Sequence, residues 1–359
     1  MANIKWSWMF GPETSNQLVN EMGWARNQTS NNGPSDDFNY TYTGDPQMAA
    51  DIRRSYILYS NYHVTTPAQT AAISGSISVP VYFNGTPQTN SDDLIFVMNS
   101  SLGTAFEIES MAGGGFQLRV AGVIKETITG FPSADNWTYL TLKYDMSTTP
   151  YSAQMWINGS GSGTTYTQAS TPQTIDGSVR IQGLNSSAGQ FAAYFGQIAT
   201  YSDWVDTETP KYVTRVNPTV DINLGGGEVT TGTWTPSVGT DNFAVLSGTF
   251  DSSTFTSNTG SATGDKVVCQ VTGALGLITQ LGTTPSVIDG ITVHAWASGS
   301  GQNGFAGLGD SQLGSWDSGT EITPDIDDPT YCFSSAPDQP SNGAVWNATS
   351  SLYIKYEVS

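Results

Sequence analysis

Glu107 and Glu109 are the acidic residues whose spacing best suits catalysis, because they lie two positions apart in the segment AFEIES. Residues two apart in a β-strand point to the same face of the sheet. Two carboxyl groups on one face are the arrangement that a glycosidase uses, with one group as acid and the other as base or nucleophile. No third acidic residue follows in the pattern that such enzymes show. An exposed strand face therefore explains the pair better than a catalytic site does.

Metal ligands are scarce in this sequence. The two histidines are far apart in the sequence, and neither has a second His or Cys at helical or hairpin spacing, as a zinc site requires. One acidic cluster supplies the oxygen ligands that calcium prefers, but its spacing is not that of an EF-hand loop. A solvated acidic loop explains the cluster better, so we predict no metal site. The residues considered are His63, His294, Asp317, Glu321, Asp325, Asp327 and Asp328.

A glycine pattern typical of dinucleotide-binding loops occurs once, at Gly299, Gly301 and Gly304. Such a loop must lead into a helix whose N-terminus holds the pyrophosphate. The following residues, FAGLGDSQLGS, do not favour a helix, so a loop without a ligand is the better interpretation. Neither a phosphate-binding P-loop nor a G-x-S-x-G nucleophile motif is present. We therefore predict no catalytic residue and no cofactor, and we expect that the chain is not an enzyme.

Composition indicates the fold that must position any site. Ser (41), Thr (45), Gly (39) and Pro (17) together make 142 of the 359 residues, and all four disfavour helix interiors. The 31 acidic and 12 basic residues give a net charge of −19. Nucleic acid is an unsuitable partner for such a chain, because phosphate contacts need clustered Lys and Arg. Forty aromatic residues, of which 10 are Trp, argue against disorder.

Short segments with alternating polar and apolar residues, separated by Gly, Pro, Asn and Ser, predict an all-β protein. The Asn158-Gly159 pair is a typical hairpin turn. A single short helix is expected near the start, capped by Thr14 or Ser15 and ended by Gly23. The predicted strands are 55–64, 73–83, 93–100, 105–110, 116–122, 137–145, 151–159, 177–184, 191–204, 242–250, 266–271, 286–298, 329–335 and 351–358.

The chain is long enough for two domains. Asn217-Pro218 and Gly225-Gly226-Gly227 interrupt the strand pattern and suggest a boundary there. Residues 218–359 hold 14 acidic and 2 basic residues, a net of −12, whereas residues 1–217 hold 17 and 10, a net of −7. We predict two β-sandwich, jelly-roll-like domains in tandem with a short N-terminal arm. The arm or first strand is 1–45, the first sandwich 46–216, and the second, acidic sandwich 217–359.

A series of segments in the first domain resembles the laminin-G-like, or concanavalin A-like, jelly-roll family. The strand WTYLTLKYD begins with Trp137, SAQMWINGS contains Asn158-Gly159, and FAAYFGQIATYSDW contains Gly196 in an F-G-x-I pattern. The resemblance covers about residues 50–205 and implies a β-sandwich. The calcium ligands and sugar-binding residues of some family members have no counterpart here, so neither activity is inferred from it.

The second domain resembles β-sandwich modules at the C-termini of tailed-phage structural proteins. The resemblance rests on Asp289-Gly290-Ile291, on a Gly-rich loop, and on Trp346 before the final strand. The opening segment IKWSWMFGPETSNQLVNEMGW is also similar to phage particle proteins. This resemblance implies a structural component of a virus particle.

We therefore predict a non-enzymatic virion protein on the exterior of a tailed-phage particle, such as a capsid decoration or cement protein. The alternative is a carbohydrate-binding adhesin or tail receptor-binding protein that recognises a host surface glycan. Other capsid or tail proteins and further copies of this chain are the expected partners, without nucleic acid or membrane. No signal peptide or membrane-spanning stretch is visible, which indicates synthesis in the host cytoplasm. Cys269 and Cys332 are the two cysteines and could pair.

Aromatic residues in the N-terminal segment are the predicted interface with a partner, because aromatics are typical interface anchors. The alternative is that IKWSWMF is simply the first strand of the sandwich. The candidate interface residues are Trp6, Trp8, Phe10 and Trp24.

Overall fold

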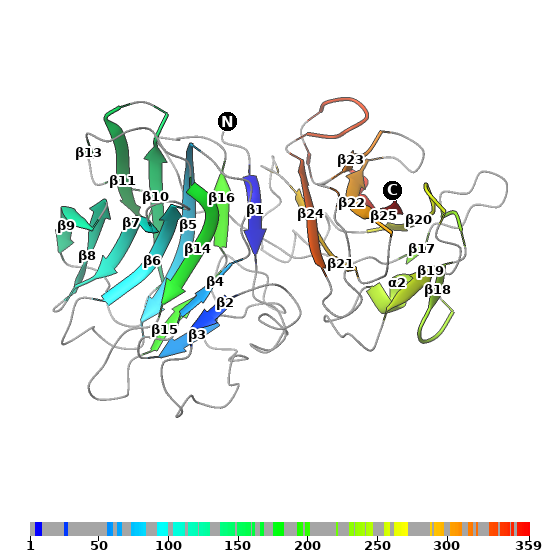
Figure 1. Ribbon diagram of the computed structural model, residues 1–359, viewed down its shortest axis with the longest axis horizontal. Helices are drawn as coiled ribbons and strands as arrows, with labels where there is room; N and C mark the ends of the chain where they lie inside the picture. Colours follow the sequence, from blue (N-terminus) through cyan, green and yellow to red (C-terminus); the bar gives the residue numbers. More distant parts are fainter. Residues whose placement is uncertain are drawn as a thin grey trace.

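The computed structural model shows a protein built almost entirely of antiparallel β-strands (Figure 1), which confirms the predicted all-β fold class. It describes residues 4–8, 25–27, 56–59, 63–66, 73–83, 92–99, 103–111, 114–120, 122–129, 137–147, 149–158, 160–161, 166–168, 175–182, 192–196, 198–201, 220–221, 230–232, 234–240, 242–246, 255–258, 262–271, 288, 291–297, 302–310, 315–318, 321, 330–336, 338–344, 346–347 and 350–359.

A nine-stranded sheet forms one layer of the N-terminal part. Its main order is β1-β16-β5-β10-β11-β12, and β3, β13 and β15 pair beside this path. The longest pairing joins β5 to β10 without a break from Ser74 to Tyr82. The strands are β1 (Ile4–Trp8), β3 (Tyr56–Tyr59), β5 (Ser74–Phe83), β10 (Trp137–Asp145), β11 (Tyr151–Ile157), β12 (Ser160–Gly161), β13 (Tyr166–Gln168), β15 (Ala192–Phe195) and β16 (Ile198–Tyr201).

A seven-stranded sheet forms the other layer, in the order β2-β4-β14-β6-β7-β8-β9. Figure 1 shows it in front of the nine-stranded sheet. Its strands are β2 (Ala25–Asn27), β4 (His63–Thr65), β6 (Asp92–Asn99), β7 (Gly103–Ser110), β8 (Gly115–Val120), β9 (Val123–Thr129) and β14 (Ile175–Gln182).

The two sheets enclose the core of the N-terminal part, which makes this part a β-sandwich. Phe106 of β7 and Tyr144 of β10 meet across the layers with their ring centroids 5.4 Å apart. Apolar residues two positions apart along β7, β8 and β10 point into this core and are at most 3% exposed, because a strand sends every second side chain to the same face. Burial raises the pKa of the Tyr144 hydroxyl far above its ordinary value. The buried core residues on these three strands are Phe106, Ile108, Phe116, Leu118, Leu140, Leu142 and Tyr144.

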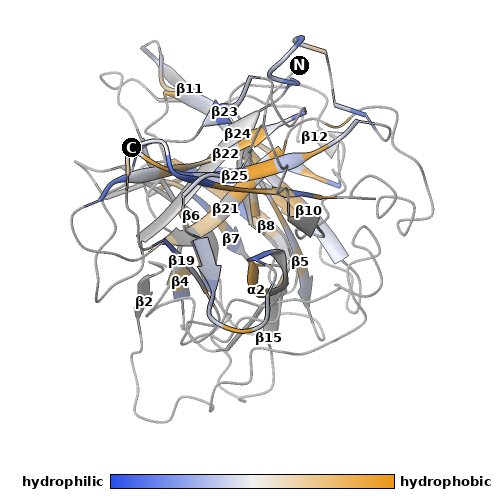
Figure 2. Cartoon of the chain, turned by 90° about the vertical axis from the view of Figure 1, so that its right-hand side faces the viewer, coloured by the Kyte–Doolittle hydropathy of each residue, from blue (hydrophilic) through white to orange (hydrophobic). Residues whose placement is uncertain are grey.

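The C-terminal part is built around a five-stranded sheet in the order β17-β20-β25-β22-β23, with β25 at its centre. Two further strand pairs, β18–β19 and β21–β24, accompany this sheet. Figure 2 shows apolar residues gathered in the middle of this part. The elements are β17 (Val220–Asp221), β18 (Trp234–Pro236), α2 (Asn242–Leu246), β19 (Thr256–Asn258), β20 (Lys266–Gln270), β21 (Ile291–Ala297), β22 (Gly304–Gly309), β23 (Asp317–Ser318), β24 (Thr330–Ala336) and β25 (Tyr353–Val358).

Trp346 lies at the centre of the C-terminal core and is fully buried. It packs with Val293 of β21 and Leu308 of β22, so it joins the β21–β24 pair to the five-stranded sheet. Ile288 donates a backbone hydrogen bond to the carbonyl of Trp346 over 3.0 Å, which fixes the segment in place.

The predicted strand 242–250 is wrong, because Asn242–Leu246 forms the short helix α2. Asp and Asn are favoured where a helix begins, and Asp241-Asn242 precedes the apolar run. A short apolar run fits a strand or a helical turn equally well, so periodicity could not separate them. The predicted helix between Thr14 and Gly23 lies outside the described residues.

The Asn158-Gly159 hairpin turn is confirmed at Asn158, whose φ of 51° is the left-handed conformation that such turns require. The Asn158 side chain also accepts a hydrogen bond of 2.9 Å from the backbone N–H of Tyr139. This bond ties the end of β11 to β10.

Every strand pairing among the described residues joins two strands of β1–β16 or two strands of β17–β25. The predicted boundary at 217 lies outside the described residues and stays a prediction. β1 lies beside the other part, next to β21 and β24 (Figure 1). None of the described helices is long and apolar enough to cross a membrane.

Candidate functional site

Glu107 and Glu109 lie on the outer face of the seven-stranded sheet, as their spacing predicts. Their neighbours Phe106 and Ile108 point into the core and are fully buried. The alternation of β7 therefore turns both carboxylates away from the sandwich interior. Glu107 is half-buried and Glu109 is only 5% exposed, so the expectation of an exposed strand face is wrong for Glu109.

Arg119 of β8 holds the more buried carboxylate in place. Its Nε donates a hydrogen bond of 2.8 Å to Oε2 of Glu109, and its Nη2 lies 2.8 Å from the same oxygen. The strand register places Arg119 directly opposite Glu107, while its guanidinium bonds to Glu109. This arrangement fixes the Glu109 carboxylate as an acceptor and neutralises its charge.

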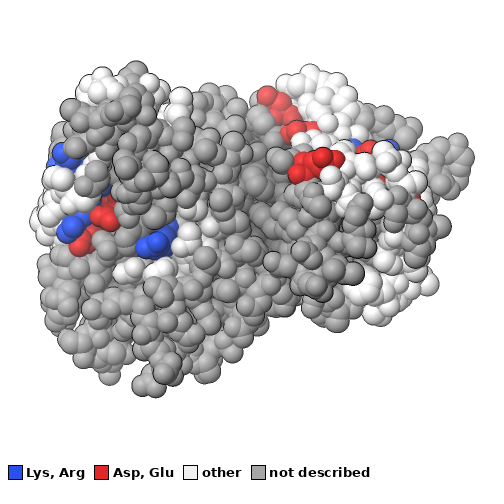
Figure 3. Space-filling view, in the orientation of Figure 1, with Lys and Arg blue, Asp and Glu red and all other residues white. Residues whose placement is uncertain are grey.

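Two further polar side chains complete this surface, which we call the polar face and define as Glu107, Glu109, Gln117, Arg119 and Arg180. Gln117 is the register partner of Glu109, and its buried Oε1 receives no hydrogen bond from the described residues. Arg180 of β14 is half-buried two strands away from β7, across β6. Figure 3 shows basic and acidic side chains side by side on this side of the N-terminal part.

The polar face offers planar carboxylate, carboxamide and guanidinium groups with both donors and acceptors. Groups of this kind bind hydroxyl-rich ligands through several hydrogen bonds in a fixed geometry. The two glutamates were predicted as a pair from their spacing, whereas Arg119, Gln117 and Arg180 were not predicted. The alternation of polar and apolar residues could have indicated their outward face. Gln117 and Arg119 are two positions apart in FQLRVAG, and Arg180 is flanked by apolar residues in GSVRIQGL.

The histidines do not come together. His63 lies in β4 and pairs with Gln182, whereas His294 lies in β21 and pairs with Phe333 in a different sheet. Among the described residues, no group of three His, Cys, Asp or Glu side chains is placed to hold a metal ion.

The predicted acidic cluster is described only at Asp317 and Glu321. Asp317 lies in β23, where burial raises the pKa of its carboxyl. Glu321 is exposed, and Asp325, Asp327 and Asp328 lie outside the described residues. Gly304 starts strand β22, so this glycine pattern does not open a helix, but the loop expected here is wrong over Gly304–Gly309.

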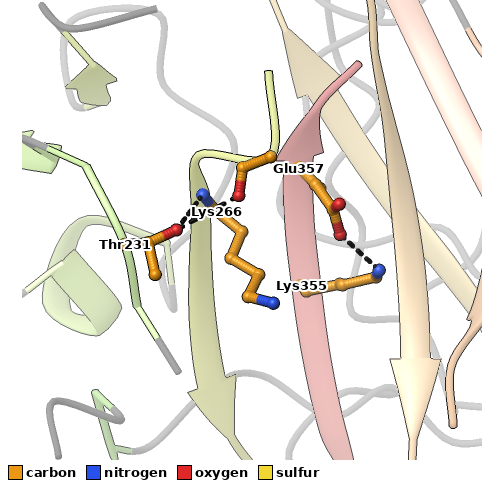
Figure 4. Close-up of polar contacts among 5 residues, drawn as sticks. Thr231, Lys266, Lys355 and Glu357 are labelled. Atoms are coloured by element: carbon orange, nitrogen blue, oxygen red, sulfur yellow. Dashed lines mark hydrogen bonds and ion pairs between the residues drawn. The ribbon is translucent and has the colours of Figure 1, made fainter. Parts of the chain in front are cut away.

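A second polar cluster lies on the five-stranded sheet, around Lys355 of β25 (Figure 4). The Nζ of Lys355 lies 2.5 Å from Oε2 of Glu357 and 5.3 Å from the ring centroids of Phe305 and Trp316. A Cβ at position 307 would lie 3.0 Å from both the Asp317 carbonyl oxygen and Cε of Lys355, so Gly307 leaves room for close packing here. Lys355 is 9% exposed, and its contacts are those of a packed structural residue.

Lys143 of β10 is a similar case on the outer face of the nine-stranded sheet. It is fully buried, and its Nζ lies 3.7 Å from the ring centroid of Trp156. A desolvated cation over an indole ring stabilises the fold. Of the three clusters, the polar face is therefore the most accessible to a ligand and the best candidate for binding.

The predicted interface residues are only partly described. Trp6 and Trp8 lie in β1, where the register pairs them with Thr200 and Ile198 of β16. Phe10 and Trp24 lie outside the described residues. The role of these aromatics in binding another protein stays a prediction.

Comparison with known proteins finds no matching protein family and no matching curated sequence. Among solved structures, the chain is similar to the botulinum neurotoxin serotype D ligand binding domain in complex with N-acetylneuraminic acid. That match has 11% identity and a TM-score of 0.35, and covers 50% of this chain and 47% of that chain. The chain is also similar to Trypanosoma rangeli sialidase in complex with sialic acid, with 10% identity and a TM-score of 0.33 over 43% of this chain. It spans 26% of the sialidase and 47% of the toxin domain, less than half of either.

Proposed function

We propose that this chain is a non-enzymatic carbohydrate-binding protein and that the polar face holds the glycan. The observation that carries the proposal is the Arg119–Glu109 ion pair beside the half-buried Glu107, with 28% of the Arg119 side chain exposed. Sugar hydroxyls both donate and accept hydrogen bonds, so a carboxylate and a guanidinium side by side at the surface supply both kinds of partner.

The geometry also supports binding over hydrolysis. Glu109 is engaged by Arg119 through two nitrogen atoms, which orients the carboxylate as a hydrogen-bond acceptor. A glycosidase needs one carboxyl group that delivers a proton to the leaving group. Glu107 is half-buried and is suited to hydrogen bonding with a sugar hydroxyl at the surface.

A printed array of neutral and acidic oligosaccharides tests this proposal. We expect the full chain to retain at least one class of glycan, and Glu107→Gln to weaken that binding about tenfold or more, since a charged hydrogen bond is lost. Lys266→Gln, on the C-terminal part, is the matched control and is expected to bind like the original chain. Equal binding by the two variants, or no retained glycan, contradicts the proposal.

We propose secondly that the chain is an exterior component of a tailed-phage particle. The supporting observation is the acidic C-terminal part, with a net charge of −12 from 14 acidic and 2 basic residues in 218–359. Figure 3 shows acidic side chains gathered on the upper edge of this part. A strongly acidic surface repels DNA and favours solubility, which suits a solvent-facing component.

Mass spectrometry of purified particles tests this second proposal. A particle component is expected at a fixed copy number relative to the major capsid protein in every preparation. Loss of the chain during particle purification would rule out the particle role and leave the glycan proposal untouched.

A further inference from the structure

The strand β1 contacts both parts of the molecule. It forms the edge of the nine-stranded sheet, where it pairs antiparallel with β16. On its other side it lies beside β21 and β24 of the C-terminal part (Figure 1). Residues from the start of the chain therefore lie between elements that are distant in the sequence.

The β16 side of β1 is anchored to a closed core. The register pairs Trp8 with Ile198, which is fully buried, and Ser7 with Ala199, which is 1% exposed. The register shifts between Ile4 and Trp6. Such a bulge bends the strand and increases its twist, so it redirects the beginning of β1 relative to the sheet.

The β21–β24 side has the composition of a buried junction. These strands pair over seven residues each, and their sequences ITVHAWA and TYCFSSA contain no Asp, Glu, Lys or Arg. Residues 218–359 have a net charge of −12 from 14 acidic and 2 basic residues, yet none of these charged residues lies in β21 or β24. Charged residues are depleted and aromatic residues enriched where protein surfaces are buried against each other. Trp296, Tyr331 and Phe333 lie in these strands, and Trp6 and Trp8 lie in β1.

We propose that β1 is the interface that holds the two parts in a fixed orientation. It completes the edge of the nine-stranded sheet and provides the surface on which β21–β24 rests. Without β1, the two parts remain joined by the chain between β16 and β17 and change their relative orientation. The aromatic N-terminal segment thus docks within its own chain.

Deletion of residues 1–9 tests the proposal, with deletion of residues 1–3, which precede β1, as the matched control. Small-angle X-ray scattering of the full chain is expected to give a radius of gyration near that of a compact protein, about 21 Å for this length. The longer deletion is expected to increase this radius, and a synthetic peptide of residues 1–9 is expected to reverse the increase. Identical scattering curves for the two deletions would overturn the proposal.

Ser7→Pro provides a second test in case the longer deletion prevents folding. Proline cannot donate a backbone hydrogen bond and disrupts strand pairing, while the chain keeps its full length. The variant is expected to keep its β circular dichroism and to show a larger radius of gyration. It is also expected to be cleaved more readily by protease between β16 and β17. A folded Ser7→Pro variant with unchanged scattering and unchanged cleavage would also overturn the proposal.

Discussion

Replacing Trp346 with alanine is expected to lower the free energy of unfolding of the C-terminal part by about 3–5 kcal/mol. Trp346 is fully buried between β21 and β22, so its removal leaves a cavity that the neighbouring side chains cannot fill. Domains are commonly stable by about 5–15 kcal/mol, so this loss is a large share of the total. Urea unfolding followed by circular dichroism measures it.

Two further variants identify the cause of that loss. Trp346→Phe keeps much of the ring volume and is expected to cost clearly less than alanine. Val238→Ala removes an apolar side chain that is 61% exposed and is expected to change stability by less than about 0.5 kcal/mol. A loss for Trp346→Ala as small as that for Val238→Ala would show that Trp346 does not hold this core together.

Alkaline pH is expected to destabilise the N-terminal part through Tyr144. Burial raises the pKa of its hydroxyl in the folded chain, whereas the unfolded chain ionises near the ordinary value of 10.0. The stabilisation from keeping Tyr144 neutral is therefore complete below pH 10 and is lost as pH rises towards the folded value. Within that window each pH unit lowers the free energy of unfolding by about 1.4 kcal/mol for this one group.

Tyr144→Phe isolates this contribution from the other tyrosines. The chain contains 16 Tyr residues, so the absolute pH dependence reports many groups at once. The difference between the original chain and Tyr144→Phe is expected to change with pH above 10 and to stay constant below it. Parallel stability curves throughout the alkaline range would show that Tyr144 ionises as easily in the folded chain as in the unfolded one.

Strand positions in the N-terminal part were predictable because period-two alternation acts locally. The segment 137–145 was predicted to the residue as β10, and 73–83 differs from β5 by one residue. β9 was missed because VIKETIT mixes charges with apolar residues at the edge of the sheet, where the alternation is weak. Lys143 shows a different limit, since period two indicates its face but does not reveal that this lysine is fully buried against Trp156.

Only Glu107 and Glu109 of the polar face could be predicted from the sequence. Glu107 and Glu109 share one strand, so their common face follows from spacing alone. Arg119, Gln117 and Arg180 come from other strands, and their places depend on the register of each pair. Register is set by packing across the whole sheet, and a shift of one residue would move every side chain to the other face.

The central position of β25 affects the order in which this chain can fold during synthesis. β20 and β22 both pair with β25, and neither pairs with the other. Since β25 occupies residues 353–358, the five-stranded sheet has no centre until the ribosome has released that segment. The N-terminal sandwich, whose described strands end at Tyr201, can close while the rest is still being translated. Until then β20 and β22 lack the strand that joins them, so we expect the five-stranded sheet to be completed last.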